Sequence, residues 1–321
     1  MDVVLFLIFL FSLFTVYFSI FLGQKIKIID NPSSEKIHKA PIPRTGGIGI
    51  FFTFLLGIIL FPKSLTSYEV IFVICIFIIG FVDDIFSIRQ SIKFVVEIIL
   101  TAILSMVNPF RFTGIYPLDV TFSTFYIVGA MNALNVIDGM DGLAGGVVII
   151  TCLFLSNFLG NLPLIIAIAC IGFLFFNFHP AKVFMGDSGS LFLGAVIGIL
   201  SLKVLNNNPS LSTLVFLIFI YSIPIYDTAI AIIRRTRKSL FSPDLKHFYN
   251  VLYDKSKKYV QTVLLIYLVS IILGFVGLFL YSMQNYLAVL IGAVIWLGLI
   301  GLGYKLGFIK EQYGKDTSVG A

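Results

Sequence analysis

The chain has 321 residues, of which 59% are hydrophobic and only 12% are charged, and its formal net charge is +6 at pH 7. This composition excludes an ordinary soluble domain and a disordered chain, and it is typical of a protein embedded in a lipid bilayer. The three cysteines lie inside apolar segments without the spacing of a disulfide or a metal site, so we expect them to pack in the core.

Eleven apolar segments follow one another along the chain, and we expect each to be a membrane-spanning helix. A crossing needs about 20 apolar residues, fewer where neighbours bury the segment, and a backbone in lipid must satisfy its own hydrogen bonds. In chain order the segments are Val3–Gly23, Gly46–Phe61, Val70–Val82, Ile92–Val107, Val120–Leu134, Leu143–Leu159, Leu164–Phe178, Leu191–Leu202, Leu211–Ile233, Val260–Tyr281 and Tyr286–Leu306. The predicted fold is therefore an all-α integral membrane protein, with one polytopic domain over residues 1–321.

The first segment is predicted to be an uncleaved helix with its N-terminus outside. Asp2 precedes it and Lys25 and Lys27 follow it, which is the reverse of the charge pattern of a cleaved signal peptide. With eleven crossings, nineteen of the 22 Lys and Arg residues then face the cytoplasm, and so does the C-terminus. Without the weakly apolar segment Val120–Leu134, the loop with eight basic residues would face outward, so the charge distribution supports that crossing.

The basic inner face suits anionic lipid headgroups or an anionic soluble substrate, and we predict no nucleic-acid partner. The simpler interpretation, in which most of these charges only set the orientation, stays open. The predicted cytoplasmic loops cover residues 24–45, 83–91, 132–142, 179–190 and 234–259.

Six aspartates lie at the edges of apolar segments, all on the predicted cytoplasmic side. Carboxylates that cluster at the bilayer edge repel one another and resist desolvation, so the cluster needs a cation. The six residues are Asp83, Asp84, Asp138, Asp141, Asp187 and Asp227. The pattern predicts a metal-dependent active site that faces the cytoplasm.

The first two cytoplasmic loops each offer charged candidates. Lys39 and Arg44 lie in a loop shaped by prolines and glycines, and they are candidates to meet a diphosphate or a nucleotide, unless the loop is only a solvated connector. Asp83 and Asp84 end the third helix, where adjacent acids oppose the helix dipole. We therefore expect this pair to serve the site, and a salt bridge to Arg89 is the alternative.

The densest motif runs from Asn132 to Gly146. Asp138 and Asp141 are three residues apart and share one face of a helical turn with Asn135. The helix that follows begins with free N–H groups, which suit a phosphate. Ordinary helix capping is the alternative for this turn.

The eighth helix opens on the stretch from Phe184 to Ser190. We predict that Asp187 is a metal-binding carboxylate in a glycine-rich turn. Phe184 is a candidate to stack on a base, and Asn177 adds a polar group to the same loop. A simple N-cap is the alternative for Asp187.

The ninth segment carries Asp227 near its cytoplasmic end, and Arg234 and Arg235 follow. Arginine clusters bind phosphate in bidentate fashion, so these residues are candidates to bind substrate. Snorkelling arginines that fix the helix depth are the alternative. His247 lies in the loop after this segment.

Taken in this order, the motifs resemble those of the polyprenyl-phosphate N-acetylhexosamine-1-phosphate transferases of glycosyltransferase family 4. The matching stretches are Pro43 to Gly47, Asp83-Asp84, Asn132 to Ala144, Phe184 to Leu191 and Pro224 to His247. The last two helices fit by position only. The resemblance implies that undecaprenyl phosphate attacks the β-phosphorus of a UDP-N-acetylhexosamine, foremost UDP-GlcNAc, to give UMP and a lipid-linked sugar diphosphate. It also implies a multi-pass enzyme of the inner (cytoplasmic) membrane that primes cell-envelope polysaccharides such as lipopolysaccharide or teichoic acid, with a homodimer as an option.

The resemblance also assigns roles to residues. It implies Mg²⁺, with Mn²⁺ as a substitute, held by Asp187 with Asp83 and Asp84 as further metal and catalytic candidates, and His247 as another catalytic candidate. Asn135, Asp138, Asp141 and Phe184 would line the nucleotide pocket. Phosphoryl transfer depends mainly on positioning and charge neutralisation, and the acceptor monoester has a second pKa of about 6. We therefore expect Asp83 to orient the acceptor or help hold the metal, without acting as a base.

One departure from the family pattern concerns the donor sugar. Relatives that use UDP-GlcNAc often carry a His-x-His-His motif, and the peptidoglycan branch, which uses UDP-N-acetylmuramoyl-pentapeptide, carries three consecutive histidines. Here His247 is followed by Phe248, Tyr249 and Asn250. This argues against the peptidoglycan branch and leaves another UDP-N-acetylhexosamine open as the donor.

Two other classes of protein are alternatives to a transferase. A cation-coupled transporter also places acids in the membrane, but it would favour acids near the midplane and paired repeats, neither of which the sequence shows. A structural membrane scaffold leaves the acid cluster unexplained.

Overall fold

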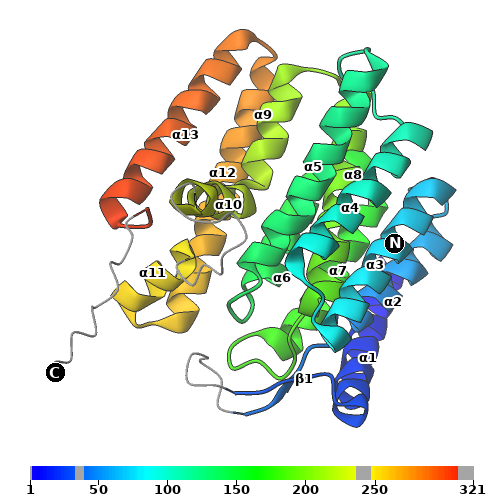
Figure 1. The fold of residues 1–321 in the computed structure, drawn as a ribbon. Coiled ribbons are helices and arrows are strands. Elements are labelled where there is room, and N and C mark those ends of the chain that lie inside the picture. Colours follow the sequence, from blue (N-terminus) through cyan, green and yellow to red (C-terminus); the bar gives the residue numbers. More distant parts are fainter. Residues whose placement is uncertain (1, 33–39, 236–246, 310–321) are drawn as a thin grey trace.

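The computed structural model describes residues 2–32, 40–235 and 247–309, and within them it is almost entirely helical (Figure 1). The helices are α1 (Asp2–Ile26), α2 (Gly46–Leu60), α3 (Ser67–Phe86), α4 (Gln90–Val107), α5 (Tyr116–Ile137), α6 (Leu143–Leu159), α7 (Asn161–Asn177), α8 (Gly186–Asn207), α9 (Leu211–Ile220), α10 (Ser222–Arg235), α11 (Phe248–Ser256), α12 (Tyr259–Met283) and α13 (Tyr286–Leu306). Two short antiparallel strands, β1 (Ile29–Asp30) and β2 (Ile42–Pro43), join α1 to α2. Sequence analysis did not predict these strands.

The predicted all-α membrane architecture is confirmed. In the described residues, α1, α4, α5, α8, α12 and α13 are long and apolar enough to cross a membrane, and α9 with α10 makes a seventh, bent span. Three further apolar helices, α2, α6 and α7, are shorter. The eleven crossings and the outer N-terminus stay predictions, because length and composition alone do not fix them.

The predicted single helix over Leu211–Ile233 is wrong. This stretch forms α9 and α10, whose axes differ by 84°. Pro224 explains the break, because it lacks the N–H that would bond the carbonyl of Ile220 and continue the helix. The hydroxyl of Thr151 donates to that carbonyl instead, at 3.0 Å.

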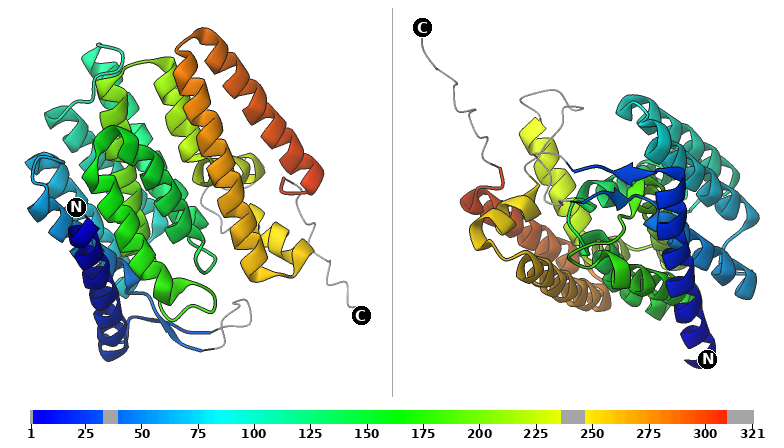
Figure 2. Two further views of the ribbon diagram at one scale, coloured as in Figure 1. Left: turned by 180° about the vertical axis from the view of Figure 1, so that it is seen from behind. Right: turned by 90° about the horizontal axis from the view of Figure 1, so that it is seen from below.

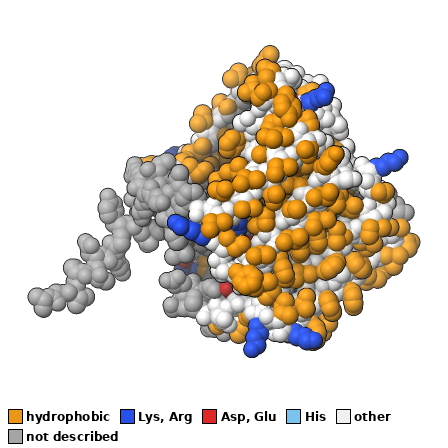
Figure 3. All heavy atoms as spheres, turned by 45° about the vertical axis from the view of Figure 1, so that its right-hand side comes forward, with side chains coloured by type: hydrophobic (Ala, Val, Ile, Leu, Met, Phe, Trp, Pro, Cys, Tyr) orange, Lys and Arg blue, Asp and Glu red, His pale blue; other side chains and the backbone are white. Residues whose placement is uncertain are grey.

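The centre of the bundle is α8, in which nearly every residue is buried. It lies between α3 and α5 (Figure 1). The peripheral helix α4 has the opposite pattern, because it buries Lys93, Glu97 and Thr101 and exposes apolar residues such as Ile99 and Ile103. The surface on the side of α1–α4 is accordingly a broad hydrophobic wall with Lys and Arg at its edges (Figure 3), as expected of a surface that faces lipid.

One end of the bundle gathers the polar motifs. The C-terminal ends of α3 and α5 and the N-terminal end of α8 lie there, and the β1–β2 hairpin crosses this end (Figures 1 and 2). The helix α11 lies toward the same end, whereas α10, which is bent away from α9, crosses the middle of the bundle (Figure 1). The bundle thus brings loops that are far apart in sequence to one surface.

Candidate active site

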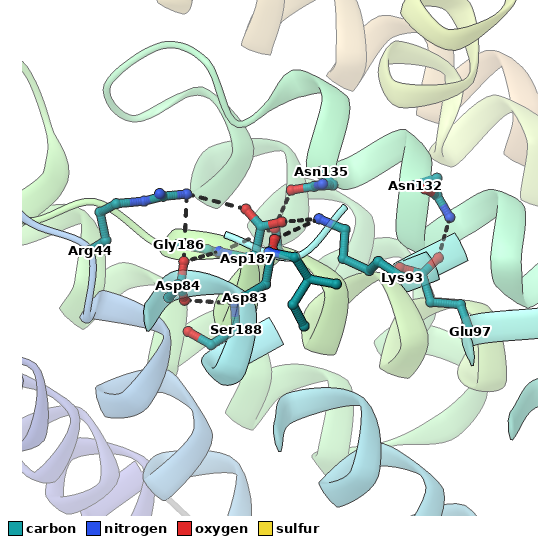
Figure 4. A network of polar contacts seen from close by, with 12 residues as sticks. Arg44, Asp83, Asp84, Lys93, Glu97, Asn132, Asn135, Gly186, Asp187 and Ser188 are labelled. Carbon is teal, nitrogen blue, oxygen red and sulfur yellow. Dashed lines mark hydrogen bonds and ion pairs between the residues drawn. The ribbon is translucent and has the colours of Figure 1, made fainter. Parts of the chain in front are cut away.

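Asp84 in the last turn of α3 caps the N-terminus of α8. Its Oδ1 accepts a hydrogen bond from the backbone N–H of Asp187 at 2.9 Å, and its Oδ2 accepts one from Ser188 at 3.0 Å (Figure 4). Gly186 permits this approach, because its φ is +73° and a Cβ there would overlap the Asp84 carboxylate. A carboxylate that opposes the dipole of its own helix therefore complements the dipole of α8.

Asp83 and Asp187 are joined by a lysine that sequence analysis counted only as an orientation charge. The Nζ of Lys93 in α4 bonds to Asp187 Oδ2 and lies 2.8 Å from Asp83 Oδ2 (Figure 4). Asp83 Oδ1 also accepts from the backbone N–H of Ile88. The buried ammonium group balances two carboxylates that would otherwise repel each other.

Arg44 adds a second cation to this carboxylate network, from the segment just after β2. Its Nη2 lies 3.4 Å from Asp187 Oδ1 and 3.6 Å from Asp84 Oδ1 (Figure 4). We use the name carboxylate network for Arg44, Asp83, Asp84, Lys93 and Asp187. Four separate segments of the chain supply its members, so the predicted convergence of the acidic motifs is confirmed for this part.

Two polar pairs support the network from α5. Asn135 accepts a hydrogen bond at its Oδ1 from Ser190 Oγ of α8, at 2.8 Å. Asn132 donates from its Nδ2 to Glu97 Oε2 at 2.6 Å, and Glu97 is fully buried one helical turn beyond Lys93. Sequence analysis missed Glu97 as it missed Lys93, although their four-residue spacing inside an apolar segment was a visible signal.

The charges of the carboxylate network act on the pKa of Asp138, which lies just after α5. Burial and the carboxylates of Asp187 and Asp84 raise the pKa of Asp138 well above its usual range, although the Arg44 guanidinium opposes the shift. The charges of Asp84 and Asp187 thus act on Asp138, and contact of its side chain with a nucleotide stays a prediction.

Asp141 and Asn177 form hydrogen bonds between the α5–α6 turn and the segment before α8. Asp141 Oδ2 lies 2.7 Å from His179 Nδ1 and accepts from the backbone N–H of Ala181 at 3.1 Å. The buried Asn177 accepts from the N–H of Gly142 and donates to the carbonyl of Val183, at 2.9 and 2.8 Å. These contacts join the α5–α6 turn to the segment before α8. A direct contact of either side chain with a nucleotide stays a prediction.

Phe184, two residues before α8, is hydrogen-bonded through its backbone to both ends of the segment that joins β2 to α2. Its backbone N–H donates to the carbonyl of Pro43 at 2.8 Å, and its own carbonyl accepts from Gly46 at 2.9 Å. These bonds fix the segment that carries Arg44 against the start of α8. Stacking of the Phe184 ring on a base stays a prediction.

Asp227 and His247 form a second pair, in α10 and at the start of α11. His247 Nδ1 lies 2.7 Å from Asp227 Oδ2, and the N–H of Phe248 donates to Asp227 Oδ1 at 3.1 Å. Asp227 is fully buried, so its main visible role is to orient the imidazole of His247.

The arginines after Asp227 take different places. Arg234 is buried and donates from Nη1 to the carbonyl of Phe308 at 2.7 Å, so this contact anchors the chain after α13. Its predicted role in substrate binding gains no support from this contact. Arg235 ends α10 but its side chain lies outside the described structure, and Lys39 lies outside the described residues.

The carboxylate network fits a hard divalent cation in part. In the described residues no group of three or more His, Cys, Asp or Glu side chains surrounds one point, so the predicted three-carboxylate metal set is not supported. Asp84 is engaged with α8, whereas Asp83 and Asp187 face one common cationic position at Lys93. Mg²⁺ is usually bound by one or two carboxylates together with substrate phosphates and waters, and these two residues fit that requirement.

Known proteins share long stretches with this chain. Residues 67–205 match the profile of the family described as "Glycosyl transferase family 4". A probable undecaprenyl-phosphate N-acetylglucosaminyl 1-phosphate transferase of Bacillus subtilis (strain 168) is 32% identical over 91% of this chain and 88% of its own length. An undecaprenyl-phosphate alpha-N-acetylglucosaminyl 1-phosphate transferase of Thermotoga maritima is 34% identical over 80% of this chain and 83% of its own length.

A more distant relative differs in its lipid. A decaprenyl-phosphate N-acetylglucosaminephosphotransferase of Mycobacterium tuberculosis (strain H37Rv) is 28% identical over 92% of this chain and 86% of its own length. The matched region of the family profile runs from α3 to α8 and therefore contains the acids of the carboxylate network.

Proposed function

The chain belongs to glycosyl transferase family 4, and we propose that it transfers N-acetylglucosamine 1-phosphate from UDP-GlcNAc to undecaprenyl phosphate, releasing UMP. The observation that carries the proposal is the carboxylate network, in which two cations and three carboxylates from separate segments meet at one end of a membrane bundle. The activities named for the relatives in Bacillus subtilis and Thermotoga maritima support the acceptor lipid and the sugar. Another UDP-N-acetylhexosamine is the alternative donor.

The proposed reaction exchanges one phosphoanhydride bond for another. An oxygen of the lipid phosphate forms a bond to the β-phosphorus of the donor, and the bond between that phosphorus and the bridging oxygen of UMP breaks. The acceptor is largely dianionic near neutral pH, because its second pKa is about 6, so no proton has to be removed. Charge neutralisation and alignment of two anions are therefore the main tasks of the protein.

The residues of the network are suited to those tasks. Lys93 and Arg44 place positive charge beside Asp187, where the phosphates would meet. Asp187 and Asp83 would hold Mg²⁺, which supplies further neutralisation of the phosphate oxygens when bound. Asp84 keeps Asp187 in place through the N-terminus of α8. Asp83 would orient the acceptor or the metal, and His247, oriented by Asp227, is a further candidate for catalysis.

The cellular setting belongs to the same proposal. The positive-inside distribution of Lys and Arg supports a cytoplasmic position for the end of the bundle that carries the carboxylate network. The enzyme would then be a multi-pass protein of the inner membrane that primes a cell-envelope polysaccharide.

The test measures UMP release by the purified protein with undecaprenyl phosphate, UDP-GlcNAc and Mg²⁺. We expect release that EDTA stops and that Asp187→Asn lowers by at least about a hundredfold. Asp254→Asn is the matched control, because Asp254 lies in α11 and its side chain is 70% exposed.

Other outcomes would change the proposal in defined ways. Release with UDP-GalNAc but not with UDP-GlcNAc would correct the sugar and keep the reaction class. No release with any UDP-sugar would contradict the proposal and favour a cation-coupled transporter.

A further inference from the structure

Three tyrosines of α11 and α12 reach the turn between α5 and α6. The hydroxyl of Tyr259 accepts a hydrogen bond from the backbone N–H of Asp141, and the hydroxyl of Tyr267 donates to the carbonyl of Gly142. The hydroxyl of Tyr249 donates to the carbonyl of Val136 at 3.3 Å. We call these three residues the tyrosine clamp.

The clamp bonds to backbone groups at the break between α5 and α6. Tyr259 accepts from the Asp141 N–H, and Tyr267 adds a second donor to the Gly142 carbonyl, which also accepts from the N–H of Gly146 at 3.0 Å. The turn between α5 and α6 interrupts both helical hydrogen-bond ladders, so N–H and C=O groups there need other partners. Asp141 and Gly142 lie in this turn, and tyrosines from more than a hundred positions later in the chain bond to them. The last helices therefore fix a turn in the region that carries the family motifs.

The fit of Tyr267 depends on a glycine of the motif. A Cβ at Gly146, in the first turn of α6, would overlap the Tyr267 ring and its hydroxyl. Gly146 thus leaves the space in which the ring of Tyr267 lies against α6.

Tyr259 makes a second contact with the same turn. Its ring stacks on the His179 imidazole, with 4.0 Å between ring centroids, and His179 Nδ1 lies 2.7 Å from Asp141 Oδ2. The backbone and the side chain of Asp141 are therefore both held, directly or through His179, by one tyrosine.

We propose that the tyrosine clamp positions the α5–α6 turn for the nucleotide of the donor. This rests on the proposed function, in which Asp138 and Asp141 line the nucleotide pocket. The clamp acts through the turn, because each hydroxyl bonds to a backbone group of the turn or of the last turn of α5. Tyr249, Tyr259 and Tyr267 are positioning residues in this scheme.

The test uses Tyr259→Phe and Tyr267→Phe, which each remove a single oxygen and keep the ring. We expect each variant to raise the KM for UDP-GlcNAc about threefold to tenfold, the effect of one lost hydrogen bond. The KM for undecaprenyl phosphate and kcat should stay within about twofold of wild type. Tyr249→Phe is left out because its hydroxyl bonds to Val136, which lies in the last turn of α5 and not in the turn itself.

Amide hydrogen exchange of residues 138–142 supplies a readout that needs no turnover. The N–H of Asp141 should exchange faster in Tyr259→Phe, because its acceptor is gone. Tyr281→Phe is the matched control: its hydroxyl is on the same helix but accepts from Asn208 Nδ2, at the other end of α12. This variant should change neither KM nor exchange in the turn.

The outcomes separate the clamp from the proposed function. Unchanged exchange in both Phe variants, or an equal rise in the KM of both substrates, overturns the clamp. If the wild-type protein releases no UMP with any UDP-sugar but the Asp141 N–H exchanges faster in Tyr259→Phe, the proposed function is overturned. The conclusion that the clamp fixes the turn is then still supported.

Discussion

Asp84 and Asp187 both lie near Arg44 but differ in their other partners. Asp84 is bonded to two N–H groups of α8, whereas Asp187 faces Lys93 and Arg44. The first carboxylate therefore belongs to the scaffold and the second to the proposed chemistry. A substitution at each position should separate stability from turnover.

Asp84→Asn should destabilise the fold. The amide would place an NH₂ group against one of the two N–H donors of α8, and loss of a helix cap costs about 1–2 kcal/mol. Thermal unfolding in detergent measures this, with Asp254→Asn as the exposed control. An unfolding temperature equal to that of wild type would show that α8 does not depend on this cap.

Lys93→Met should lower kcat by at least about a hundredfold, because it removes a preorganised positive charge where the phosphates meet. Lys257→Met is the control, because Lys257 lies at the same end of the bundle with its side chain 70% exposed. Initial rates of UMP release provide the comparison. Equal rates for the two variants would remove Lys93 from the proposed site.

Sequence reasoning found the acids of the site and missed its buried cation. Asp83, Asp187 and Arg44 were found because charged residues at the edges of apolar segments need an explanation. Lys93 lies in the first turn of α4, where a positive charge is also expected as an orientation signal. Only the three-dimensional packing of α4 against α3 and α5, which brings Lys93 to Asp83 and Asp187, distinguishes the two roles.

At the scale of helices, hydropathy located the elements but not their geometry. Each predicted apolar segment is helical, yet the average hydropathy of Leu211–Ile233 carries no trace of the 84° bend. Pro224 was the available signal, because a proline after the first turn of a helix removes a backbone hydrogen bond. The tyrosine clamp left no periodic signal, since its contacts join residues far apart in sequence.

The bend should depend on the hydroxyl of Thr151. Thr151→Val keeps the shape of the side chain but leaves the buried carbonyl of Ile220 without its donor, at a cost of about 1–3 kcal/mol. Thr151→Ser keeps the hydroxyl and should stay close to wild type. Thermal unfolding of the two variants in detergent tests this, and equal losses would show that methyl packing, not the hydrogen bond, matters at the break.

At the scale of the molecule, the polar motifs of the described residues gather at one end (Figure 1), and the distribution of the basic residues predicts that this end faces the cytoplasm. Labelling of single cysteines tests this orientation. In intact cells a membrane-impermeant maleimide should label Lys63→Cys, in the exposed turn between α2 and α3, and should leave Lys257→Cys unlabelled until lysis. The unsubstituted chain is the control, and the reverse labelling pattern would contradict the predicted orientation in the membrane.

The central claim is that separate segments build one cation-binding centre for two phosphates. The most direct measurement is Mn²⁺ binding, followed by electron paramagnetic resonance with UDP-GlcNAc present and acceptor lipid absent, so that no turnover occurs. We predict that Asp187→Asn and Asp83→Asn each weaken Mn²⁺ binding by at least about tenfold, whereas Asp254→Asn binds like wild type. Unaltered Mn²⁺ binding in Asp187→Asn would contradict the account.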